Sequence, residues 1–147
     1  MGECVLPVLL EAAKSAETED WQRARIFAVA RALPGTHKGD FTELAAEHLT
    51  GNIVYGYPAL SLIESFKSSK HAPAVCDYLL RAVKEDIAEK TVSSRPIFKT
   101  FSVIGTRKEL ERMDEWIADH KERLGKGHAI WKLVSTAADE LRAKLSA

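Results

Sequence analysis

The sequence predicts an all-α fold of about eight helices, and three observations favour it. Apolar residues recur at intervals of three and four along most of the chain, whereas strand-like alternation is nearly absent. Prolines and glycines divide the chain into stretches of helical length. Of the 147 residues, 46% are hydrophobic and 29% are charged, which is typical of a domain that buries its own core. We therefore expect a single helical domain over residues 1–147.

The first three helices are predicted from spacing and from the residues at their ends. Residues 3–15 carry apolar side chains on one helical face, and a second helix is expected from Thr18 to Leu33. The break at residues 34–36 (Pro-Gly-Thr) ends this second helix. We expect Asp40 to cap a third helix, which ends near Gly51.

Prolines mark the starts of the next three helices. Residues 53–57 are rich in β-favouring side chains, but no partner strand is evident, so we interpret them as the lead-in to a fourth helix that starts at Pro58. A fifth helix is expected from near Pro73 to about Glu89. The sixth starts at Pro96 and ends by Gly105, because proline suits a first helical turn and glycine a helix end.

Two helices complete the predicted fold. Thr106 is expected to cap the seventh, in which Leu110, Met113 and Ile117 begin an apolar stripe. A Gly-Lys-Gly break at 125–127 separates it from the eighth, which runs from His128 to the end. Trp116, in the seventh helix, and Trp131, in the eighth, are expected to be core residues.

The chain also contains an internal match at an offset of 38 residues. Without a gap, this offset superposes the fourth and fifth predicted helices on the sixth and seventh. The matched pairs are Pro58 with Pro96, Ile63 with Phe101, Phe66 with Ile104, Lys70 with Lys108, Tyr78 with Trp116 and Leu79 with Ile117. Each unit is thus a proline-started helix, a short polar turn and a second helix that carries an aromatic residue.

A repeat of this length, made of two helices, resembles the HEAT-like (armadillo-type) helical-repeat proteins. The resemblance implies antiparallel helical hairpins stacked in a short α-solenoid. The alternative is a multi-helix bundle, in which the helices look alike because all are amphipathic.

Composition and charge narrow the class of function. Lys plus Arg equals Asp plus Glu at 21 each, so no overall field attracts nucleic acid or anionic membrane. No apolar run is long enough to span a membrane, and the first residues lack the pattern of a secretory signal. Cys4 and Cys76 are too few for a disulfide framework. We expect a soluble cytoplasmic protein that does not bind membranes.

No motif for catalysis, cofactor binding or metal binding can be assembled from the sequence. The five histidines and two cysteines lack the spacings of common metal sites, and no nucleophile elbow or phosphate loop is present. We therefore predict no catalytic residue, no metal and no cofactor. An enzyme whose polar groups converge from distant parts of the chain is the third-ranked alternative.

The resemblance to helical repeats places the working surface on the second helix of each unit. On that face we expect charged residues of both signs, together with two tyrosines in the preceding connection. The predicted partner-binding residues are Tyr55, Tyr57, Asp77, Arg81, Lys84, Arg112, Glu115 and Asp119. A surface of mixed sign suits another folded protein, so the leading hypothesis is a non-enzymatic adaptor or inhibitor, immunity-like by analogy of architecture alone.

Nucleic-acid binding is the second hypothesis. Lys67, Lys70, Arg107 and Lys108 lie at the hairpin turns, and the equivalence of Lys70 with Lys108 would let successive turns form a basic ridge. The neutral total charge makes this partner less favoured than a protein.

Overall fold

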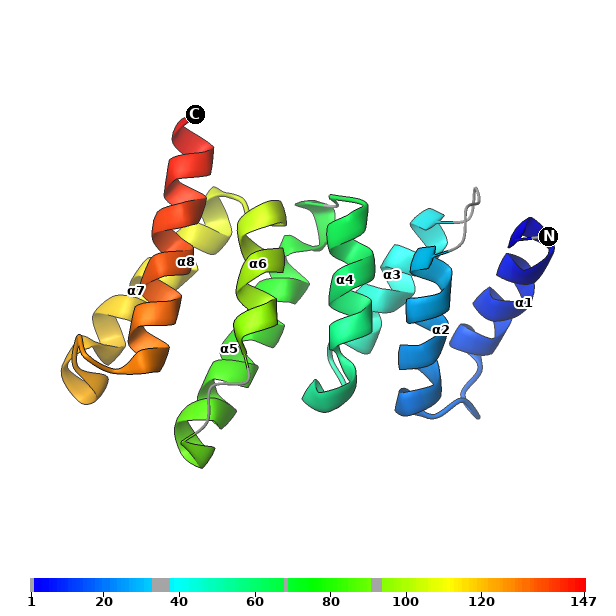
Figure 1. Cartoon of the computed structure of the whole chain (residues 1–147), viewed down its shortest axis with the longest axis horizontal. Helices are drawn as coiled ribbons and strands as arrows, with labels where there is room; N and C mark the ends of the chain where they lie inside the picture. The colour runs from blue at the N-terminus through cyan, green and yellow to red at the C-terminus, as the bar shows by residue number, and fades with distance from the viewer. Residues whose placement is uncertain (1, 33–37, 68, 91–93) are drawn as a thin grey trace.

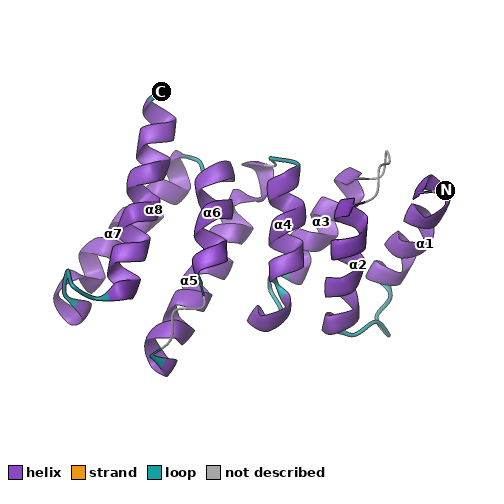
Figure 2. Cartoon of the chain, in the orientation of Figure 1, coloured by secondary structure: helices purple, strands orange, loops and turns teal. Residues whose placement is uncertain are grey.

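The computed structural model describes residues 2–32, 38–67, 69–90 and 94–147. Within these ranges the chain forms eight α-helices and two short 3-10 helices, with no strand, so the predicted all-helical class is confirmed (Figure 2). The elements are α1 (Gly2–Lys14), α2 (Asp20–Ala32), α3 (Lys38–His48), η1 (Ile53–Tyr55), α4 (Tyr57–Ser65), η2 (Ser69–His71), α5 (Ala72–Glu89), α6 (Arg95–Ile104), α7 (Arg107–Leu124) and α8 (Ala129–Ser146).

Most predicted helix ends lie within two residues of the observed ones. Thr106 immediately precedes α7, and its amide donates to Glu109 Oε2 at 2.8 Å, as in a capping box. The prediction for Asp40 is wrong: α3 begins at Lys38, so Asp40 lies in the first turn, where its charge still suits the helix dipole. The break predicted at residues 34–36 lies outside the described residues.

The helices form two rows that run in opposite directions (Figure 1). In the front row α2, α4, α6 and α8 each pack extensively against the next. The helices α1, α3, α5 and α7 also follow one another, with α1 at the right-hand end of the view, but neighbours in this row touch over fewer residues. The even-numbered helices are therefore packed more closely against one another than the odd-numbered helices are.

The hairpins are divided differently from the predicted units. The antiparallel neighbours that pack together are α1 with α2, α3 with α4, α5 with α6, and α7 with α8. The predicted units instead joined α4 to α5 and α6 to α7. The 38-residue offset relates α4 to α6 and α5 to α7, so it describes a translation along the two rows and not the boundary of a hairpin.

The core lies between the rows, and its largest fully buried residues include Phe27, Phe41, Phe101 and Tyr78. The Tyr78 hydroxyl donates to the Ile53 carbonyl and so fastens η1 to α5. A side chain on Gly56 would overlap the Tyr78 ring, so this connection requires glycine. Burial raises the pKa of Tyr78, which keeps the hydroxyl protonated as a donor.

Candidate functional site

The open spacing of the odd-numbered row leaves a cavity of about 500 Å³ between the C-terminal halves of α5 and α7, which we call the α5–α7 groove. Its apolar lining comes from Leu80, Ile87, Trp116 and Leu124, and its polar lining from Lys84, His120 and Arg123. Residues 80, 84 and 87 share one face of α5, since they are spaced by four and three. No carboxylate lines this groove among the described residues.

Trp116 and His120 form a flat wall on the α7 side of the groove. Their rings stack with centroids 4.1 Å apart and an angle of 11° between planes. His120 Nδ1 lies 2.9 Å from the Trp116 carbonyl oxygen, which holds the imidazole in this orientation. Both side chains are partly exposed, so the expectation that Trp116 is a core residue is only partly met: it packs on the core and also faces the groove.

A second cavity, of about 310 Å³, lies on the other side of α5. It is lined by Ile53 from η1 and by Arg81, Lys84, Glu85 and Ala88 from α5. Lys84 lines both cavities, so they adjoin across α5. After Ile53 come two exposed apolar residues, Val54 at 69% and Tyr55 at 37% exposure. The hollowed surface therefore extends from η1 across α5 to α7.

Three residues predicted for partner binding, Asp77, Arg81 and Arg112, are held by contacts within the protein. Arg112 Nη2 lies 2.6 Å from Asp77 Oδ1 and joins α7 to α5. Arg81 donates to the carbonyl oxygens of Leu49 at 2.9 Å and Gly51 at 2.5 Å, where α3 ends. Arg81 thus satisfies carbonyls left unpaired by the helix end. Of the predicted α5 residues, Lys84 alone lines the α5–α7 groove.

The remaining predicted partner residues are dispersed. Glu115 and Asp119 are exposed on α7 but do not line the groove. Tyr55 is at the rim of the surface around η1, and its carbonyl lies 2.9 Å from His48 Nε2. Tyr57 is partly buried and lines a different cavity, with Leu60 and Lys99, on the even-numbered row. The structure therefore separates the two tyrosines that the sequence analysis grouped.

The basic turn residues lie at one edge, where the N-terminal ends of α5 and α7 meet the same side of the molecule (Figure 1). Lys67, Arg107 and Lys108 are exposed. Lys70 is also exposed, but it forms an ion pair with Glu43, and its hydrogen bond lowers the pKa of that carboxyl. The predicted basic ridge is thus interrupted by an acidic partner at Lys70.

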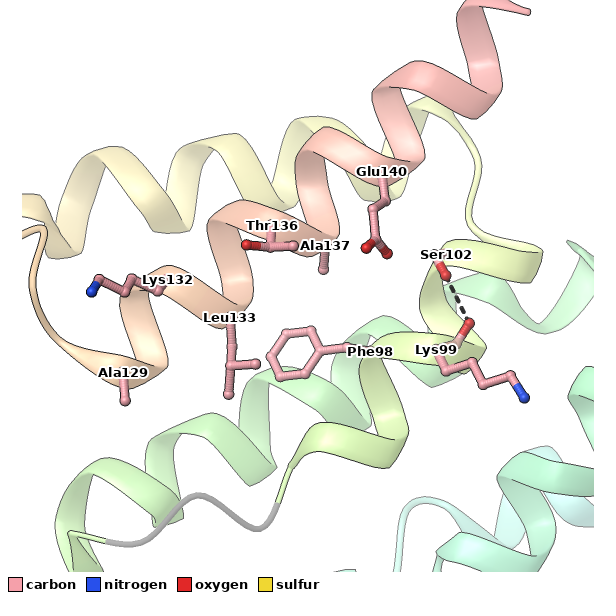
Figure 3. A pocket seen from close by; sticks show the side chains of 9 residues that line it. All are labelled: Phe98, Lys99, Ser102, Ala129, Lys132, Leu133, Thr136, Ala137 and Glu140. Atoms are coloured by element: carbon pink, nitrogen blue, oxygen red, sulfur yellow. Dashed lines mark hydrogen bonds between the residues drawn. The ribbon is translucent and has the colours of Figure 1, made fainter.

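A comparable cavity of about 420 Å³ lies between α6 and α8; we call it the α6–α8 groove (Figure 3). Phe98, Leu133 and Ala137 supply apolar lining, and Phe98 and Ala137 are buried. Lys99, Lys132 and Glu140 supply its charges. Lys99 Nζ also lies 3.9 Å from Glu64 Oε1, so carboxylates accompany the cations here.

Five residues that line the groove were not predicted from the sequence as site residues: Leu80, Ile87, His120, Arg123 and Leu124. The available signal was the shared helical face of residues 116, 120, 123 and 124, which combines a large aromatic side chain with a terminal arginine. The same pattern is equally typical of a helix face that is buried in the core and ends in a solvent-exposed arginine. The distance between α5 and α7 distinguishes these interpretations, and it depends on the packing of the whole row.

Other kinds of site receive no support from the described part of the chain. There, no group of three or more His, Cys, Asp or Glu side chains could hold a metal ion. No helix in those ranges is long and apolar enough to cross a membrane. The Cys76 thiol is buried, and desolvation raises its pKa to about 11 despite the nearby charge of Arg112, so it is a poor nucleophile at neutral pH.

Comparison of the chain with protein-family models, with curated proteins and with solved structures finds no match.

Proposed function

We propose that this protein is a non-enzymatic, cytoplasmic protein-binding module, an adaptor or inhibitor, that binds its partner on the odd-numbered row. The observation that carries the proposal is the α5–α7 groove, where a partly exposed tryptophan, aliphatic side chains and an arginine converge. Tryptophan and arginine are enriched among the residues that contribute most to binding at protein interfaces.

The proposal includes the architecture. We interpret the two rows as a short HEAT-like α-solenoid, because helices pack mainly within their hairpin and against neighbours along their row. Such stacking presents each row as a continuous surface, whereas a closed bundle would bury the inner faces of all its helices. The 38-residue offset agrees with this interpretation, since it relates successive members of both rows.

A protein is favoured over nucleic acid as the partner for two reasons. The groove lining is largely apolar, whereas phosphate backbones are held mainly by cations and polar groups. In addition, Lys70 at the basic edge forms an ion pair with Glu43, which reduces the positive charge that phosphates would meet. The surroundings of the groove carry Glu115 and Asp119, which suit a protein surface of mixed sign.

Affinity capture from the cells of origin tests the proposal. The full chain is compared with a Lys84→Glu/Arg123→Glu variant and with a matched Lys99→Glu/Lys132→Glu variant, which changes net charge equally. We expect one stoichiometric protein with the wild type and the matched variant, and its loss from the groove variant. Recovery of nucleic acid alone, or of no protein above background, would contradict the proposal.

A further inference from the structure

We infer that the α5–α7 groove binds an acidic amphipathic segment of the partner, with a large apolar side chain inserted beside Trp116 and carboxylates placed at Lys84 and Arg123. The inference rests on the proposed protein-binding function and specifies the chemistry of the bound segment.

The charges of the groove supply the first argument. Lys84 and Arg123 are exposed and project from opposite helices onto one cavity. Neither forms an ion pair within the described part of the chain. Arg112, one turn from Trp116 on α7, is instead paired with Asp77. Because the lining has two cations and no carboxylate, a bound segment that carries Asp or Glu would be electrostatically complementary to it.

The apolar lining supplies the second argument. Leu80 and Ile87 from α5 face the stacked Trp116 and His120 rings from α7. A charged ligand without an apolar part would leave these surfaces hydrated and would gain nothing from them. The volume of about 500 Å³ lies within the range of pockets that accept side chains or small ligands. The groove therefore favours a ligand with both an apolar body and acidic groups.

The shape of the surface favours a peptide segment over a small acid. Because Lys84 lines the cavities on both sides of α5, a chain that crosses α5 can occupy both of them. The second cavity offers Ile53 and Ala88 as further apolar contacts, with exposed Val54 beside it. It also contains Glu85, which would repel a continuous run of phosphates but leaves room for a peptide whose acidic residues are spaced.

The α6–α8 groove provides a matched internal control. It has a similar volume and two lysines, but Glu140 lines it (Figure 3). In addition, Glu64 Oε1 lies 3.9 Å from Lys99 Nζ. Its largest apolar side chain, Phe98, is only 7% exposed, so little of it is offered to a ligand. An acidic segment should therefore discriminate between the two grooves.

A display selection with random 16-residue peptides tests the inference on the full chain. We expect enriched peptides to combine acidic residues with Leu, Phe or Trp. By fluorescence polarisation, their dissociation constants should rise about tenfold or more in Lys84→Glu/Arg123→Glu. The dissociation constants should change less than about threefold in Lys99→Glu/Lys132→Glu. For the wild type, the dissociation constants should rise with ionic strength. All four substituted side chains are exposed, and circular dichroism verifies that both variants fold.

A second pair of variants separates the apolar contribution from charge. Trp116→Ala should weaken the selected peptides about tenfold or more, whereas Trp21→Ala, which removes a 40% exposed tryptophan beside Arg25 on α2, should not. Enrichment of basic or neutral peptides, indifference to Lys84→Glu/Arg123→Glu, or no enrichment at all would each overturn the inference. The proposed function fails separately, if affinity capture recovers no protein partner.

Discussion

The α5–α7 and α6–α8 grooves are alike in volume and in carrying two cations, yet they differ in how their apolar residues are used. In the α6–α8 groove Phe98 and Ala137 belong to the buried core of the close-packed row. In the α5–α7 groove Trp116 and Leu80 are only partly buried, because the odd-numbered row is more open. The aromatic residue of the α6–α8 groove is thus buried in the core, whereas that of the α5–α7 groove remains partly exposed and can be covered by a partner.

The difference shows that the two rows of helices pack, and bury their apolar residues, to different extents. The even-numbered helices contribute stability by packing on one another. The odd-numbered helices touch over fewer residues, so a few side chains determine the chemistry of the surface between them. Apolar surface that stays in contact with water does not stabilise the fold, and the stabilisation lost is about 25 cal/mol for each Å² left exposed. A substitution in the α6–α8 groove should therefore mainly lower the free energy of unfolding. A substitution in the α5–α7 groove should mainly weaken binding of the partner.

The largest effect is expected for Phe98→Ala. Phe98 is 7% exposed and belongs to the core, so its removal costs transfer free energy and leaves a cavity. We expect a loss of about 3–5 kcal/mol in the free energy of unfolding, measured by urea denaturation. A loss below about 1 kcal/mol would show that the α6–α8 contact is not a core contact, and the comparison would fail.

The next effect concerns the interior of the odd-numbered row. The Cys76 pKa of about 11 lies above the ordinary value of 9.0, because burial disfavours the thiolate. Its stabilising contribution is therefore fully present below pH 9 and is lost as the pH rises through 11. Between pH 8 and 11, the wild type should lose about 2 kcal/mol more unfolding free energy than Cys76→Ala, because a tenfold change in acidity corresponds to about 1.4 kcal/mol. Equal losses in the two proteins would mean that water reaches this side of α5.

A smaller loss of stability is expected for Trp116→Ala. Its ring is partly exposed, and its contacts are with His120 and the edge of the core. We expect about 1–2 kcal/mol in the same urea experiment, well below the effect of Phe98→Ala, together with the loss of peptide binding. If Trp116→Ala were as destabilising as Phe98→Ala, the tryptophan would be a structural residue and the two grooves would not differ in kind.

The smallest effect is expected for the ion pair across the odd-numbered row. Asp77 and Arg112 are substantially exposed, so a double-mutant cycle with alanine should give a coupling energy of about 0.2–1 kcal/mol. Arg142 and Asp114, which join α8 to α7 with the same 2.6 Å separation, provide the matched pair. The two coupling energies should be similar. A clearly larger value for Asp77 and Arg112 would indicate that this pair holds the α5–α7 groove open at a fixed width.

Helix positions could be predicted because they depend on local signals. Pro58, Pro96 and Gly105 mark ends that follow from backbone restrictions, and Thr106 with Glu109 forms its contact within one turn. Asp40 was misplaced because the same acidic residue is favourable both as a cap and in the first turn of a helix. A carboxylate is stabilised by the helix N-terminus in either position, so the sequence does not show which of the two Asp40 occupies.

The pairing of helices and the site could not be predicted to the same degree. The 38-residue offset is equally compatible with hairpins formed by α4 and α5 or by α5 and α6, and packing decides between them. Arg81 looks like a free surface cation until its bonds to the Leu49 and Gly51 carbonyls, 32 and 30 residues away, are known. The groove itself depends on the separation of α5 from α7, which no residue pattern within either helix specifies.

Site-specific photo-crosslinking in living cells tests the central claim most directly. A photoreactive amino acid is placed at position 84 or 123 in the α5–α7 groove, and at 99 or 132 in the α6–α8 groove. We predict a crosslink to one protein from 84 and 123, competed by a selected acidic peptide, and none to that protein from 99 or 132. A crosslink to the partner from 99 and 132, with none from 84 and 123, would contradict the account.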